Sequence, residues 1–128
     1  SLKKTRIEQV IEQCALNTVL NKPIGKLSRG FRQRVGMANV LLHEPEVLIM
    51  DEPTAGLDPN QVLEVRKMIK GLGKTILLST HILQEVPQVA DRILLIDQGR
   101  LVFDGTPDQL KEESSLDSWF NRQTMDAA

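Results

Sequence analysis

The sequence has 128 residues, a length that fits one small domain or part of a larger one. Lys and Arg number 16 against 17 Asp and Glu, and this net charge of −1 argues against a protein that binds nucleic acid or lipid by bulk charge. Hydrophobic residues make up 41% and aromatic residues 3% of the chain, so general disorder is excluded and the core must consist mainly of Leu, Ile and Val.

The sequence also bears on the cellular compartment. The single cysteine, Cys14, excludes an internal disulfide and favours a reducing compartment. Apolar runs are far shorter than the roughly 20 residues of a membrane-spanning helix. No cleavable signal sequence opens the chain, because Lys3, Lys4 and Arg6 lead directly into a helical pattern. A soluble, cytoplasmic protein is therefore expected.

Two helices are predicted at the start of the chain. Apolar residues recur at helical spacing over about residues 4–20, and the Asn21-Lys22-Pro23 segment ends this helix. A second helix begins at Ser28, its N-cap, and ends before Pro45. Its predicted buried face consists of Phe31, Val35, Ala38 and Leu42.

Three short apolar runs then predict strands that are buried on both faces, at residues 47–51, 75–80 and 92–96. A helix is predicted between the first two, over about Asn60–Lys70, with Asp58 as N-cap and Pro59 as its first residue. Strand, helix and strand at this spacing indicate a parallel pair with a right-handed crossover.

The C-terminal part is predicted to contain shorter elements. A short helix over Leu83–Ala90 is possible only if Pro87 lies in its first turn. Residues 97–100 turn the chain into a hairpin with a strand at 101–103, and Thr106–Gln109 forms a capping box that opens a helix. A last helix is predicted over 114–122, followed by a frayed tail over 123–128.

The most informative chemical feature is the acid pair Asp51-Glu52 at the end of the first predicted strand. Ligands bind at this edge of a parallel sheet, and the next strand brings His81 to the same edge. Because successive strand residues point to opposite faces, one acid could hold Mg²⁺ while the other orients an attacking water. The alternative is that the acids are ordinary loop residues.

A second candidate site lies at the start of the second helix. Free N–H groups and the positive end of the helix dipole favour an anion beside Ser28-Arg29-Gly30, although a simple helix cap is the alternative. Asp58 caps the next helix and could still present its carboxylate outward. No P-loop occurs in these 128 residues, because Met68 stands where Gly73-Lys74 would need its first glycine.

In order along the chain, four segments resemble motifs of the ATP-binding-cassette (ABC) ATPases. They are the signature motif at Leu27–Phe31, the Walker B strand at Val47–Glu52, the D-loop at Ala55–Asp58 and the switch histidine at Ser79–His81. The resemblance runs from about Ile7 to Gly105. The residues Glu52-Pro53-Thr54 and the stretch 91–105 are typical of transporter subunits.

The resemblance implies a role for each motif. Asp51 would bind Mg²⁺ through water, Glu52 would polarise the hydrolytic water and His81 would contact the γ-phosphate of ATP. Ser28 and Gly30, with the positive charge of Arg29, would grip a γ-phosphate bound on the opposite subunit. Asp58 would cross that dimer interface.

The resemblance also implies the fold class and its parts. The expected α/β fold is part of a RecA-like P-loop NTPase parallel sheet with flanking helices, together with part of the ABC helical subdomain. Residues 1–45 would belong to the helical subdomain, 46–105 to the C-terminal part of the ATPase core and 106–128 to C-terminal helices and the tail. The P-loop strand, expected between the strands at 75–80 and 92–96, is absent from this sequence.

This signature departs from its commonest form, with Arg29 in place of glycine and Phe31 in place of glutamine. With these substitutions, the signature resembles that of bacterial exporters of the drug, sodium and gliding-motility type.

The expected function is therefore that of an ABC exporter ATPase, in a fragment that lacks the P-loop and is inactive alone. Expected partners are a second ATPase subunit and a membrane permease, without nucleic acid, at the cytoplasmic face of the inner membrane. The alternatives are an inert dimerisation or regulatory half-domain and an ABC ATPase without a transport role.

Overall fold

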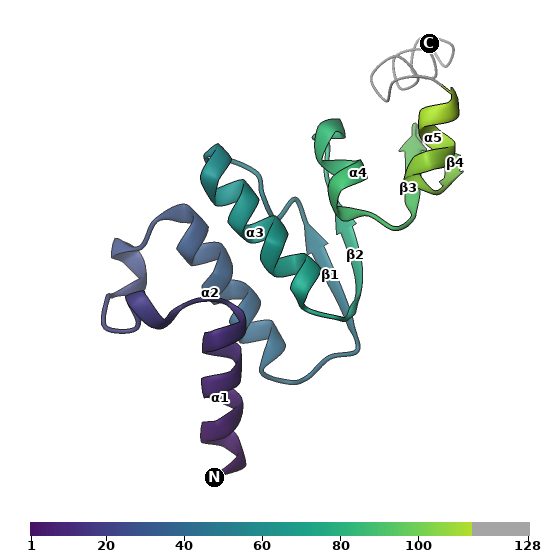
Figure 1. Ribbon diagram of the computed structural model, residues 1–128. Helices are drawn as coiled ribbons and strands as arrows, with labels where there is room; N and C mark the ends of the chain where they lie inside the picture. The colour runs from purple at the N-terminus through teal and green to yellow at the C-terminus, as the bar shows by residue number, and fades with distance from the viewer. Residues whose placement is uncertain (114–128) are drawn as a thin grey trace. The chain divides into compact units, whose positions relative to one another are not determined.

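The computed structural model describes residues 1–113 and divides the chain into two compact units, Ser1–Ser79 and the residues from Thr80 onward (Figure 1). The helix and tail predicted at 114–128 lie outside the described residues. The first unit contains α1 (Leu2–Gln13), the 3₁₀ turns η1 (Asn17–Val19) and η2 (Ile24–Lys26), α2 (Arg29–Leu41), β1 (Val47–Asp51), α3 (Pro59–Gly71) and β2 (Thr75–Ser79). The second contains η3 (Leu83–Glu85), α4 (Val86–Val89), β3 (Ile93–Asp97), β4 (Arg100–Gly105) and α5 (Pro107–Glu113).

The first helix is shorter than predicted. α1 ends at Gln13, and Ala15 adopts a φ of 51°, a left-handed conformation that breaks the α-helical ladder. The chain then forms η1, and Leu16 and Val19 enter the core. Apolar spacing alone did not predict this break, because the apolar residues on both sides of it are buried in one core.

The next four elements agree closely with the prediction. β1 and β2 pair in parallel, from Val47 opposite Thr75 to Asp51 opposite Ser79, and α3 connects them. α3 ends at Gly71, within one residue of the predicted end at Lys70, and β2 ends at Ser79, one residue before its predicted end. Arg34 of α2 is buried and forms an ion pair with Glu64 of α3, so charge as well as apolar packing joins the two helices.

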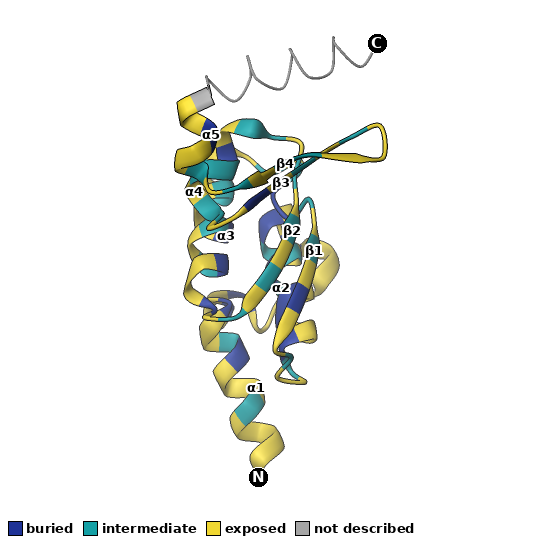
Figure 2. Cartoon of the chain, turned by 90° about the vertical axis from the view of Figure 1, so that its right-hand side faces the viewer, coloured by how far each residue is buried: buried dark blue, intermediate teal, exposed yellow. Residues whose placement is uncertain are grey.

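The strands of this unit are not buried on both faces, contrary to the prediction. One face, with Leu48 at its centre, packs into a core built from α1, α2, α3 and the turns between them. Side chains of the other face are exposed, with exposed fractions of 58% for Val47, 79% for Ile49 and 56% for Leu77 (Figure 2). The reason is that the helices of this unit pack on only one side of its two strands.

The second unit is built on an antiparallel hairpin of β3 and β4. Gln98 and Gly99 both have positive φ, the conformation of the tight turns that join hairpin strands. Pro87 stands in the first turn of α4 and Thr106 caps α5 through the predicted capping box, so both predictions are confirmed. Ile93 and Leu110 form a small core, while Ile96 is 69% exposed, so β3 too lacks the predicted burial on both faces.

The four strands form two separate sheets. β1 pairs only with β2, and β3 only with β4, among the described residues. The expectation that a P-loop strand would lie between β2 and β3 stays a prediction. The division at residues 45 and 105 into family subdomains stays a prediction. In the described part of the chain, no helix has both the length and the apolar character needed to cross a membrane.

Candidate functional site

The acid pair lies at the carboxyl end of β1, next to the end of β2. Asp51 is the last residue of β1 and pairs in register with Ser79, the last residue of β2. The Ser79 hydroxyl donates a hydrogen bond to the Asp51 carboxylate. The backbone N–H of Glu52 donates to the Ser79 carbonyl at 2.9 Å and to its Oγ at 3.1 Å. Ser79 therefore fixes the positions of both acids.

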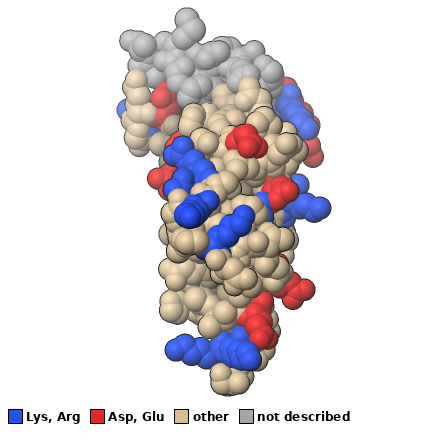
Figure 3. Space-filling view, turned by 90° about the vertical axis from the view of Figure 1, so that its left-hand side faces the viewer, with Lys and Arg blue, Asp and Glu red and all other residues tan. Residues whose placement is uncertain are grey.

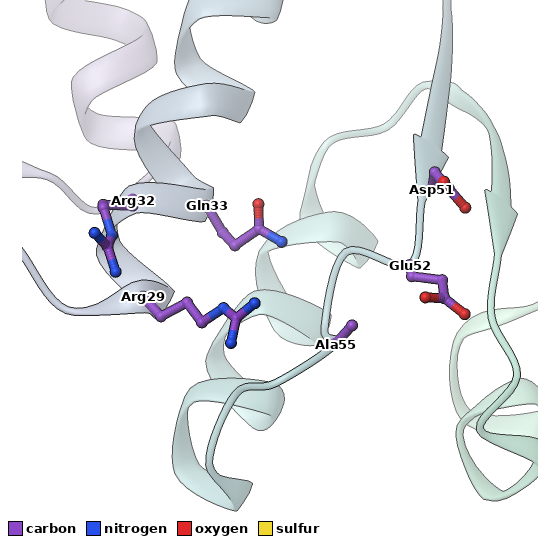
Figure 4. Close-up of a pocket in the computed structure, with 6 residues that line it drawn as sticks. All are labelled: Arg29, Arg32, Gln33, Asp51, Glu52 and Ala55. Carbon is purple, nitrogen blue, oxygen red and sulfur yellow. The ribbon is translucent and has the colours of Figure 1, made fainter.

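Glu52 does not continue the alternation of the strand, contrary to the prediction that the two acids point to opposite faces. Its φ of 46° takes the backbone out of the extended conformation immediately after Asp51. Figure 4 shows both carboxylates on the same side of the chain. The backbone is held in this sparsely populated conformation by the two hydrogen bonds to Ser79, an arrangement that is common at functional sites.

A hollow of about 410 Å³ lies between the start of α2 and the acid pair. Its lining residues are Arg29, Arg32, Gln33, Asp51, Glu52 and Ala55. In Figure 4, Arg29 and Gln33 reach from α2 toward the loop that follows Glu52, whereas Arg32 is turned away from that loop. Cationic and amide groups therefore face the loop that begins at the acids.

The start of α2 has the features of a capped helix. The Ser28 hydroxyl accepts a hydrogen bond from the Phe31 N–H at 3.2 Å and is the predicted N-cap. Gly30 is buried, and a Cβ at this position would lie 3.1 Å from the Gln61 side chain. A glycine here lets α2 approach α3 closely.

Asp58 is the predicted N-cap of α3. Its Oδ1 accepts from the Gln61 N–H at 2.9 Å, and the Gln61 side chain accepts from the Asp58 N–H at 3.2 Å. The residue is exposed, so its carboxylate can also face a partner. The capping role is confirmed, and the role at a dimer interface stays a prediction.

His81 belongs to the second unit and follows β2 by two residues. The loop around it is braced by Thr80, whose hydroxyl donates to the buried Glu85 at 3.2 Å and accepts from the Ile82 N–H at 3.1 Å. The structure places His81 in a defined, exposed loop. Its convergence with Asp51 and Glu52 stays a prediction.

Two residues of this region, Ser79 and Gln33, had no predicted role. Ser79 is the hydrogen-bond partner of both acids, and Gln33 donates to the Pro53 carbonyl at 3.0 Å. Aligning the two predicted strands would have placed Ser79 beside Asp51. No comparable signal identifies Gln33, because its contact depends on how α2 packs.

The acid pair fits a magnesium ion that keeps most of its water. Among residues 1–113, no group of three or more acidic, His or Cys side chains could enclose a metal. Mg²⁺ does not need such a group, because it is usually held by one or two carboxylates, water and substrate phosphates. Asp51 is exposed, and its remaining lone pairs could accept hydrogen bonds from the water of such a hydrated ion.

The surface charge is mixed. Figure 3 shows basic and acidic side chains together on one face, and most of that face consists of other residues. This agrees with the net charge of −1 for the whole sequence. An anion would therefore have to be bound by local groups and not by the overall charge of the chain.

Comparisons with known proteins agree with this geometry. Residues 2–55 match the family described as ABC transporter. The bacitracin transport ATP-binding protein BcrA of Bacillus licheniformis is 43% identical over 116 residues, which are 88% of this chain and 38% of that protein. The daunorubicin resistance ATP-binding protein DrrA3 of Streptomyces coeruleorubidus is 41% identical over 117 residues, which are 89% of this chain and 37% of that protein.

A solved structure extends the agreement to the fold. The structure of cbiO1 from Clostridium perfringens, described as part of the ABC transporter complex cbiONQ, matches with a TM-score of 0.80 and 36% identity. The match covers 92% of this chain and 49% of that one, so the chain spans less than half the length of the proteins named here. In sequence and in fold, these 128 residues belong to the ATP-binding proteins of the ABC transporter family.

Proposed function

We propose that this chain is part of the ATP-hydrolysing subunit of an ABC transporter, and that the complete subunit energises a membrane permease. The observation that carries the proposal is the acid pair at the end of β1, held by Ser79 and facing the start of α2 across one hollow. The names of two relatives, bacitracin transport and daunorubicin resistance, favour an exporter. The complete protein would then act at the cytoplasmic face of the inner membrane, bound to its permease.

In this proposal, each site residue acts on the terminal phosphate of ATP or on the water that attacks it. Asp51 holds hydrated Mg²⁺, Glu52 accepts a proton from the attacking water, and His81 donates a hydrogen bond to the γ-phosphate. When bound, Mg²⁺ neutralises part of the phosphate charge. The defined backbone of Glu52 supports its role, because a general base must be held within hydrogen-bond reach of the proton that it takes.

The other site residues act across a dimer of ATPase subunits. Ser28 and Gly30 present backbone N–H groups at the start of α2, and Arg29 adds positive charge to this anion site. The phosphate that they contact is bound mainly by the second subunit. Asp58, exposed at the start of α3, lies at the dimer interface in this proposal.

Replacing Glu52 by glutamine tests the proposed chemistry. The change is made in a protein that carries these residues together with a P-loop. We expect Glu52→Gln to lower kcat for ATP hydrolysis by about 100-fold or more, because glutamine cannot accept the proton. Glu46→Gln is the matched control, since it removes the same charge at the other end of β1. Equal activity of the two variants would contradict the role of Glu52.

A further inference from the structure

Two side chains of α2 contact the loop between Glu52 and Asp58. Gln33 Nε2 donates a hydrogen bond to the carbonyl of Pro53 at 3.0 Å, near the beginning of the loop. The guanidinium of Arg29 lies against Gly56, near its end. Figure 4 shows both side chains directed from α2 toward this loop. The loop is therefore held at two points by the helix that begins with the anion site.

The contact between Arg29 and Gly56 depends on a long side chain at position 29 and on the absence of a side chain at position 56. A Cβ at position 56 would lie 2.5 Å from Nη1 and 2.8 Å from Cζ of Arg29, far closer than atoms can approach. Gly56 also has a φ of 73°, which glycine adopts without steric cost. Arg29 stands where the commonest form of the signature has a glycine. A glycine at that position would have no side chain that could reach the loop.

The loop carries a candidate site residue at each end. Glu52 opens it in a left-handed conformation, and Asp58 closes it as the cap of α3. Within the loop, Ala55 N–H donates to the Glu52 carbonyl at 3.1 Å and Leu57 N–H donates to the Thr54 carbonyl at 3.3 Å. These two short turns connect Pro53 and Gly56 to the residues at the two ends of the loop.

We propose that Arg29 and Gln33 are positioning residues, which couple the anion site at the start of α2 to the loop that bears Glu52 and Asp58 in the same subunit. This inference rests on the proposed function. A phosphate bound beside Ser28 and Gly30 restrains the first turn of α2. Arg29 and Gln33 pass that restraint to the loop and hold the general base in place.

Amide hydrogen exchange of the 128-residue chain tests whether Arg29 and Gln33 hold the loop, without any ATPase assay. We expect Arg29→Ala and Gln33→Ala each to speed exchange at Ala55 and Leu57 by about fivefold or more, the factor that one lost interaction of ordinary strength produces. Amides of α1 keep their rates, which separates a local effect from global destabilisation. Arg32→Ala is the matched control: it removes a charge from the same turn of α2, and its side chain is turned away from the loop.

A double variant tests the specific contact. Gly56→Ala speeds loop exchange because its Cβ overlaps the guanidinium and its φ is strained. In Arg29→Ala/Gly56→Ala the overlap is gone, so the combined effect is smaller than the product of the two single effects. The inference would be overturned if the effects of the two single variants on the exchange rate simply multiplied in the double variant. It would also be overturned if loop exchange in Arg29→Ala and Gln33→Ala equalled that in Arg32→Ala. These exchange rates do not depend on whether the protein hydrolyses ATP. A result that disproves the proposed function therefore differs from one that disproves the positioning role of Arg29 and Gln33.

Discussion

Ser79 is the residue on which the local geometry of the acid pair depends. Its hydroxyl donates to Asp51 and accepts from the Glu52 N–H, while its carbonyl accepts from the same N–H. Ser79 thereby holds the Asp51 carboxylate and the Glu52 backbone across a parallel strand pair. Serine suits this position because its Oγ can donate and accept at once.

Replacing Ser79 by alanine removes both side-chain hydrogen bonds. We expect Ser79→Ala to lower the free energy of unfolding by about 1 kcal/mol, a typical net value for a hydrogen bond that is partly open to water. Urea unfolding monitored by circular dichroism measures the change. Ser79→Thr keeps the hydroxyl and is the control. A Ser79→Ala variant as stable as the parent chain would show that the contact contributes nothing.

The ion pair of Arg92 and Asp104 in the second unit gives a pH prediction. Arg92 donates two hydrogen bonds of 2.7 Å to the carboxylate, and they hold the pKa of Asp104 below its usual range. Since the pKa is lowered in the folded state, the stabilisation is complete above the pKa of an unfolded Asp. It is lost as the pH falls through the lower folded value.

Asp104→Asn isolates this contribution. We expect the variant to have a lower urea midpoint than the parent chain at about pH 7, and the difference to shrink as the pH falls below about 4, the ordinary pKa of an aspartate, because protonation of the carboxyl removes its negative charge. Because both side chains are partly or largely exposed, high salt reduces the difference. A difference that stays constant across this pH range would contradict the assignment.

At the level of elements, local signals predicted most of the first unit. The caps of α2 and α3 were visible in Ser28 and Asp58, and the apolar runs identified both strands. What the sequence did not reveal depends on conformations and packing that no periodicity encodes. Ala15 and Glu52 take left-handed φ values, and the exposed face of β1 follows from helices that pack on one side only.

The capping box of α3 can be separated from the site role of Asp58. We expect Asp58→Ala to lower the free energy of unfolding by about 1 kcal/mol, because the Gln61 N–H loses its partner. Asp58→Asn keeps an oxygen that can cap the helix and should leave stability nearly unchanged. Thermal unfolding distinguishes the two variants. If both destabilise equally, the charge of Asp58 and not its cap supports the helix.

Over the whole molecule, the described residues supply only part of the ATPase site that we propose. The acid pair and the proposed anion site at α2 lie in the first unit, whereas His81 lies in the second. The backbone cradle and the lysine of a P-loop, which bind the phosphates of the nucleotide, do not occur in these 128 residues. The motifs thus point to the residues that we propose for hydrolysis, and their roles, like the placement of His81 beside the acids, stay predictions.

Phosphate release from ATP tests the central claim most directly. It should be measured for the 128-residue chain and for the same residues preceded by the P-loop segment of a family member. We predict no measurable turnover by the chain alone, turnover once the P-loop is supplied, and its loss in Glu52→Gln. Robust turnover by the 128-residue chain itself, abolished by Glu52→Gln, would contradict the account.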